Sequence, residues 1–209
     1  MLKKIVLSLL LIFGISEAIS QKVVEELHDA AGIERLIIAS DLINTLTITS
    51  EATNQIRVVS KVVGENYESL LVTTSEENKI FKIGAFYSPY FIPENDKLAA
   101  HKLMSVDIEL TIPNSLFVEV SAPIASISAT GNYANFQAYL ESGDCELSRF
   151  LGNASITTKG GDITVYAKED VSGRAFSEKG SVVNYLPGRA RYTIIAESRD
   201  GDISLLQTK

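Results

Sequence analysis

The chain has 209 residues, 45% of them hydrophobic, a formal net charge of −7 and a single cysteine. An acidic chain without a basic stripe is not suited to bind nucleic acid or an anionic membrane surface. One cysteine cannot form a disulfide within the chain, so packing and backbone pairing must supply the stability.

The first 20 residues have the features of a cleavable secretion signal. Lys3 and Lys4 precede the apolar run 5–15, and small residues end the segment at Ala18 and Ser20. The run is shorter than the about 20 apolar residues that a membrane span needs. We expect cleavage after Ser20, or alternatively after Ala18. Residues 21–209 should then form a single exported domain, either periplasmic or on the cell surface or secreted, with a net charge of −8 because the leader carries +1.

After the leader, apolar and polar residues mostly alternate, which is the period of a β-strand. The exception comes first, at 23–31, where Glu25, Glu26 and His28 are compatible with a short N-terminal helix. Strands are then predicted, in chain order, at 46–48, 56–58, 70–72, 80–83 and 106–110. The polar clusters 50–54 and 75–78 are predicted to be turns between them.

Between the last two of these strands, the segment 86–102 interrupts the pattern with two prolines and several aromatic residues. Aromatic rings on an irregular loop offer a large contact area at low entropic cost, as partner recognition often requires. The candidate partner-binding residues are Tyr87, Tyr90, Phe91, Asp96, Lys97, His101 and Lys102. The alternative is that this loop folds back as a cap over an exposed edge of the core.

The second half of the chain carries a repeat, marked by one anchor residue in each unit. The anchors Ile127, Cys145, Ile163, Val182 and Ile203 lie 18, 18, 19 and 21 residues apart. Two residues, mostly apolar, precede each anchor by nine and seven positions, a spacing that places both on one face of a strand. These pairs are Val118/Val120, Phe136/Ala138, Ala154/Ile156, Gly173/Ala175 and Ile194/Ala196. We interpret each unit as strand, tight turn, strand, wider turn, with glycine in the tight turn because it tolerates positive φ.

A repeat of this length predicts an all-β stack in which each unit buries its apolar face against its neighbours. The fold class expected is a β-solenoid-like stack of short strands, with coils of about 20 residues that each add one rung. The alternative is an antiparallel β-sandwich, because short strands at regular spacing give a similar pattern.

The turns at 142–145, 159–163 and 199–203, preceded by 111–114 and 118–120, resemble the putative-adhesin family of bacterial domains of unknown function. The resemblance covers 106–206, about half of the chain. It implies a right-handed β-solenoid related to the head domains of auto-transporter adhesins. It also implies a location in the cell envelope.

The acidic residues of the tight turns are candidates for a cation site. Stacking would place Asp144, Asp162 and Asp202 about 4.8 Å apart along one edge, and Ca²⁺ prefers oxygen ligands of this kind. Ser181 interrupts the series. A structural role in the turns is therefore preferred, and no metal or other cofactor is predicted.

Other catalytic and metal-binding chemistry finds little support. His28 and His101 lack the spacing of a metal site, and Cys145 occupies an apolar anchor position, where a small buried hydrophobe is expected. No pair of acids is singled out as a glycosidase dyad. Three function classes remain: a binding module for a protein or glycan, a structural spacer, and a polysaccharide-acting enzyme. We favour the non-catalytic envelope binding module, with no oligomeric state predicted.

Overall fold

The computed structural model describes residues 21–64, 67–89 and 104–208. This part of the chain contains strands and one 3₁₀ turn, η1 (Tyr67–Ser69), and no α-helix. The strands are β1 (Gln21–Asp29), β2 (Arg35–Ala39), β3 (Ile43–Glu51), β4 (Gln55–Val63), β5 (Leu70–Glu77), β6 (Ile80–Tyr87), β7 (Ser105–Pro113), β8 (Phe117–Ser121), β9 (Ser126–Tyr139), β10 (Cys145–Thr158), β11 (Ile163–Ala167), β12 (Val171–Ser177), β13 (Val182–Asn184), β14 (Tyr192–Ser198) and β15 (Ile203–Gln207). The predicted all-β class is confirmed. No helix long and apolar enough to cross a membrane occurs among these residues.

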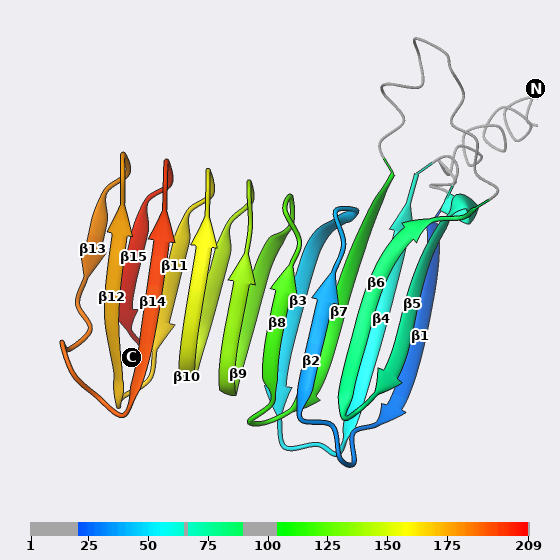
Figure 1. The fold of residues 1–209 in the computed structure, drawn as a ribbon, viewed down its shortest axis with the longest axis horizontal. Coiled ribbons are helices and arrows are strands. Elements are labelled where there is room, and N and C mark those ends of the chain that lie inside the picture. Colours follow the sequence, from blue (N-terminus) through cyan, green and yellow to red (C-terminus); the bar gives the residue numbers. More distant parts are fainter. Residues whose placement is uncertain (1–20, 65–66, 90–103, 209) are drawn as a thin grey trace, which may run out of the picture.

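The strands lie in two layers, one behind the other in Figure 1. The first layer has the order β1-β4-β7-β3-β9-β10-β11-β15-β13. The second layer has the order β5-β6-β2-β8-β9-β10-β14-β12. Strands β9 and β10 have 14 residues each and belong to both layers, since their first halves pair in the first layer and their second halves in the second.

In β9 and β10 the passage from one layer to the other is a bend within a continuous strand, whereas the wider turns that the repeat suggested are present at 168–170, between β11 and β12, and at 185–191, between β13 and β14. Gly131 in β9 and Gly152 in β10 have φ values of +115° and +145°, which side chains larger than hydrogen rarely adopt. Both glycines also lie against a neighbouring backbone: an added Cβ would overlap the carbonyl oxygen of Ser50 or of Tyr133, respectively. Glycine at these two positions therefore lets a continuous strand serve both layers.

The core lies between the layers, and Ile127, Cys145, Ile163 and Ile203 line it in register, whereas the fifth anchor, Val182 of the outermost strand β13, is 43% exposed. Ile127 pairs with Cys145, and Cys145 with Ile163, in parallel strands, and none of the three is more than 3% exposed. Val118, Phe136 and Ala154 are paired in the same way in the second layer. The predicted register of these repeats is confirmed.

The last two repeats lie in exchanged order, so the expectation that each coil adds the next rung was wrong there. Ile203 pairs with Ile163 on one side and with Val182 on the other, which makes β13 the outermost strand although it precedes β15 in sequence. Ile194 likewise lies between Ala154 and Gly173.

In the β12–β13 unit, which ends the stack, side chains of the unit cover part of its unpaired edge. Gly173 leaves room that the side chains of Leu186 and Asn184 occupy, and the Asn184 amide donates to the Gly173 carbonyl at 2.9 Å. Leu186 is 8% exposed in this position. These side chains cover only part of this end of the stack, because Val182, Val183 and Tyr185 remain 43%, 38% and 76% exposed.

The N-terminal end of the stack is antiparallel, and the predicted helix at 23–31 was wrong. Residues 21–29 form β1, which pairs with β4 over nine residues and so satisfies the backbone without a helix. Its partly buried side chains alternate as Val24, Glu26 and His28. His28 bonds Glu26 at 3.0 Å, and its ring meets Phe81 of β6 edge-on at 4.8 Å.

The hairpin β5–β6 is the other antiparallel element of this end. Its turn is confined to Asn78 and Lys79, with φ values of 52° and 66°, the conformation of a tight two-residue hairpin turn. Residues 75–77, predicted to belong to the turn, continue β5 instead. The turn predicted at 50–54 is shorter as well, because β3 extends to Glu51. All five strands predicted upstream of the repeat are present.

Candidate functional site

The glycine–aspartate turns form a structural ladder along one edge of the stack. The Asp144 carboxylate accepts the backbone amide of Asp162 at 2.9 Å, and Asp162 accepts that of Asp202 at 2.8 Å. Asp202 in turn accepts the amide of Ser181 at 2.7 Å. Ser181 replaces aspartate in the outermost turn of the stack, where no further turn of the described structure offers an amide to accept. The described residues contain no cluster of three His, Cys, Asp or Glu side chains suited to a metal ion.

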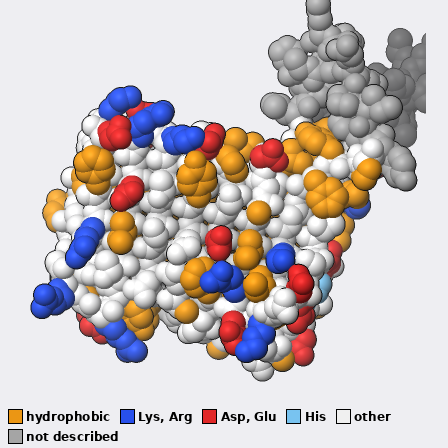
Figure 2. All heavy atoms as spheres, viewed as in Figure 1, with side chains coloured by type: hydrophobic (Ala, Val, Ile, Leu, Met, Phe, Trp, Pro, Cys, Tyr) orange, Lys and Arg blue, Asp and Glu red, His pale blue; other side chains and the backbone are white. Residues whose placement is uncertain are grey.

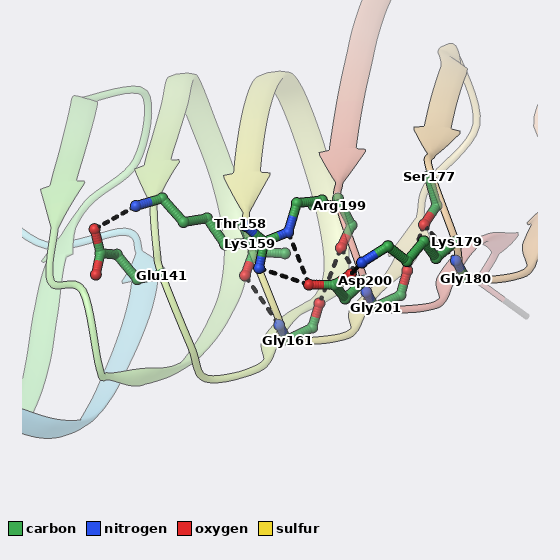
Figure 3. A network of polar contacts seen from close by, with 11 residues as sticks. Glu141, Thr158, Lys159, Gly161, Ser177, Lys179, Gly180, Arg199, Asp200 and Gly201 are labelled. Atoms are coloured by element: carbon green, nitrogen blue, oxygen red, sulfur yellow. Dashed lines mark hydrogen bonds and ion pairs between the residues drawn. The ribbon is translucent and has the colours of Figure 1, made fainter.

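Glycine in these turns is required mainly by the close approach of neighbouring coils. An added Cβ at Gly161 would overlap the Gly143 carbonyl oxygen, and one at Gly201 would overlap that of Gly161. Gly143 has a positive φ, +115°, whereas Gly161, Gly180 and Gly201 do not, so the expected reason for glycine applies to Gly143 alone. In three turns the backbone amide of the glycine donates a hydrogen bond to a hydroxyl three residues earlier (Figure 3). The pairs are Gly161 with Thr158, Gly201 with Ser198 and Gly180 with Ser177.

Charged side chains bridge the same turns at the surface (Figure 3). Glu141 and Lys159 are 2.6 Å apart, and Asp200 bonds Lys179 at 2.6 Å and Arg199 at 2.7 Å. These bonds, that of Lys179 first, lower the pKa of the Asp200 carboxyl. Asp200 is half-buried and its partners, like Glu141 and Lys159, are exposed, so these ion pairs add little to the free energy of unfolding.

Cys145 faces the core, as its anchor position predicts. Its side chain is 1% exposed, and burial raises the pKa of the thiol to about 12. A protonated thiol without access to solvent is not a nucleophile at neutral pH.

Of the predicted partner-binding residues, the structure describes Tyr87 alone. Tyr87 is the last residue of β6, opposite Leu70, and is 42% exposed. The other candidates lie outside the described residues: Tyr90, Phe91, Asp96, Lys97, His101 and Lys102.

A surface that the sequence did not single out is the outer face of the second layer (Figure 2). Tyr139 of β9 and Phe176 of β12 lie in one row across the strands, joined through Thr157 of β10 and Glu197 of β14. The two rings are 44% and 61% exposed. In the sequence, each stands six positions before its anchor, where other units have Ser121, Thr157 and Glu197. That shared position is the signal by which they could have been found.

The same face has two depressions along this row, and residues of the row line both. A depression of about 360 Å³ lies over β8, β9 and β10, and one of about 270 Å³ over β14 and β12. The lining of the first is Glu119, Val120, Ser121, Gln137, Ala138, Tyr139, Ser155 and Thr157. The lining of the second is Arg174, Ala175, Phe176, Ile195, Ala196 and Glu197. Both depressions are open to solvent on the outer face of the layer.

Comparison with solved structures shows a shared fold. The structure of a putative cell adhesion protein from Clostridium sporogenes is similar over 90% of this chain and 100% of that one, with a TM-score of 0.64 and 14% sequence identity. A putative adhesin from Bacteroides fragilis covers 90% of this chain at a TM-score of 0.36 and 10% identity, with 98% of its own chain matched. No protein family and no curated protein matches the sequence. At these identities the likeness concerns the fold alone.

Proposed function

We propose that the chain is an exported, non-catalytic, adhesin-like binding module of the bacterial cell envelope, with a protein or a glycan as its partner. The observation that carries the proposal is the outer face of the second layer, where Tyr139 and Phe176 are exposed in one row beside two depressions. Exposed aromatic groups on a rigid surface are typical of recognition sites. The secretion signal predicted from the sequence at 1–20 supports export to the periplasm or the cell surface.

We propose further that the scaffold is a right-handed β-solenoid with an antiparallel N-terminal end. The parallel, in-register pairing of anchors from separate repeats supports the coil, and β1–β4–β7 and β5–β6 supply the antiparallel part. Such a scaffold holds outward side chains at fixed spacing, which suits a binding surface.

The segment 86–102, which begins with the last two residues of β6, remains a second proposed contact. Phe86 and Tyr87, at its start, are 44% and 42% exposed at the end of a second-layer strand. Tyr90 and Phe91 would provide further aromatic anchors, with Asp96, Lys97, His101 and Lys102 as polar partners.

A cross-linked pull-down of residues 21–209 against the envelope fraction of the source cell tests the proposal. The matched variant is Tyr90→Ala/Phe91→Ala, with its urea unfolding midpoint measured in parallel. Saturable capture supports the binding module, and its loss in the variant at unchanged stability assigns the contact to the loop. The absence of any saturable partner would favour the structural spacer.

A further inference from the structure

We propose that the outer face of the second layer binds an uncharged glycan chain that lies across β8, β9, β10, β14 and β12. The site is the trough formed by the two depressions, with the rings of Tyr139 and Phe176 as stacking platforms. This inference rests on the proposed binding function and specifies its ligand class and location.

The two depressions form one path because their strands are consecutive. β10, at the border of the larger depression, pairs directly with β14 of the smaller one. Tyr139 and Phe176 are in register three strand spacings apart, which corresponds to about 14 Å across the sheet. A ligand that contacts both rings must therefore be extended and must run across the strands.

The floor of the trough disfavours a peptide added as a β-strand. The backbones of β8, β9, β10 and β14 are each paired on both sides within the second layer. A peptide strand gains most of its affinity from unpaired backbone groups, and here such groups occur only at the free edge of β12. The trough itself offers side chains alone.

Those side chains match the hydroxyl groups and the apolar ring faces of a sugar. Ser121, Gln137, Ser155 and Thr157 project from three neighbouring strands, and in the described part of the chain none of their side chains bonds to another protein group. They provide donors and acceptors without charge. The rings of Tyr139 and Phe176 supply flat apolar contacts at low entropic cost.

The charges along the trough select against an anionic polymer. The larger depression contains one charged residue, Glu119, which lies 3.9 Å from Arg35. The smaller one contains Arg174 and Glu197, of opposite sign. Lys159 contacts the Tyr139 hydroxyl but is also paired with Glu141 at 2.6 Å. Carboxylates therefore balance the cations beside the path, and a polyanion would gain little net attraction.

Isothermal titration of residues 21–209 tests the inference with defined probes. These are uncharged hexasaccharides of β-linked glucose, mannose and N-acetylglucosamine, with a hexagalacturonate as the acidic comparison. The variants are Tyr139→Ala and Phe176→Ala. The matched control is Tyr166→Ala, because Tyr166 of β11 is 39% exposed on the outer face of the opposite layer.

We expect at least one uncharged hexasaccharide to bind, and each trough variant to weaken its affinity about tenfold or more. The Tyr166 variant should bind as the wild type does. The inference is overturned if no uncharged probe binds, if the acidic probe binds more tightly, or if both trough variants bind normally. Capture of an envelope protein with no binding of any hexasaccharide would overturn this inference and leave the binding module standing.

Discussion

The Asp162 carboxylate accepts a hydrogen bond from the backbone amide of Asp202, 40 residues later, at 2.8 Å. The contact exists because the last coil of the chain inserts beside Asp162 and displaces the coil that precedes it. This hydrogen bond can form only if the turns are aligned and the last coil lies beside Asp162.

Removing this carboxylate should destabilise the fold through the turn ladder. For Asp162→Ala we expect the free energy of unfolding to fall by about 1 kcal/mol, the usual net value of one hydrogen bond. Asp162→Asn keeps an acceptor oxygen and removes a charge from between Asp144 and Asp202, so it should be at least as stable as the wild type at low salt. Urea unfolding measures both, and equal losses in the two variants would contradict the ladder.

Adjacent glycines of one turn should respond differently to alanine. In Gly161→Ala the new methyl group overlaps the Gly143 carbonyl, and the coils must move apart at a cost of roughly 3 kcal/mol. The matched control is Gly160→Ala, where the nearest atom would be the Glu141 oxygen at 3.5 Å. It should change stability by less than about 0.5 kcal/mol. Similar unfolding midpoints for the two variants would show that the turns are not closely stacked.

Two consecutive residues of β11 point to opposite faces of the sheet and should differ in their tolerance of substitution. Ile163 is fully buried, so Ile163→Asn would leave an amide in the core without a partner and should lower the free energy of unfolding by roughly 4 kcal/mol. Thr164 faces outward, and Thr164→Asn should lie within about 0.5 kcal/mol of the wild type. Thermal or urea unfolding distinguishes them, and tolerance at both positions would refute the register.

Stability should decrease in alkaline solution because of Cys145. The unfolded thiol has a pKa of about 8.5, whereas burial raises the folded value to about 12. Between these two pKa values the unfolded chain binds fewer protons than the folded chain. The contribution of the Cys145 thiol to the free energy of unfolding is therefore complete below about pH 8.5 and is lost as the pH rises. By pH 10.5 the loss should be about 2–3 kcal/mol.

The control for this pH dependence is Cys145→Val, which lacks the thiol. Burial also raises the pKa of Tyr133, but this phenol is present in both proteins. The difference between the two unfolding profiles therefore isolates the thiol. Parallel profiles from pH 8 to 11 would contradict the burial of Cys145.

Except at Val182, which is 43% exposed, the repeat in the sequence predicted which anchors face the core and which of them are aligned. Ile127, Cys145 and Ile163 are in register because hydrophobic periodicity reports on burial, which dominates the choice of register. The exchange of the last two units was not predictable in this way. An apolar anchor fits any rung of the stack, and the contacts of Gly173 with Leu205, Asn184 and Leu186 appear only in the folded arrangement.

Two other features needed the structure. The helix expected at 23–31 is strand β1. Its inward side chains include the polar residues Glu26 and His28, so hydrophobicity did not show the two-residue period of a strand. The trough residues Tyr139 and Phe176 belong to different repeats, and their shared row appears only once β14 is known to lie between β10 and β12.

The measurement that most directly tests the binding function is a saturation curve of residues 21–209 on the envelope fraction. It should be run beside the Tyr139→Ala/Phe176→Ala variant and the Tyr166→Ala control. We expect the wild type and the control to saturate alike and the double variant to bind at least about tenfold more weakly. Non-saturable binding, or identical curves for all three proteins, would contradict a recognition surface on the second layer.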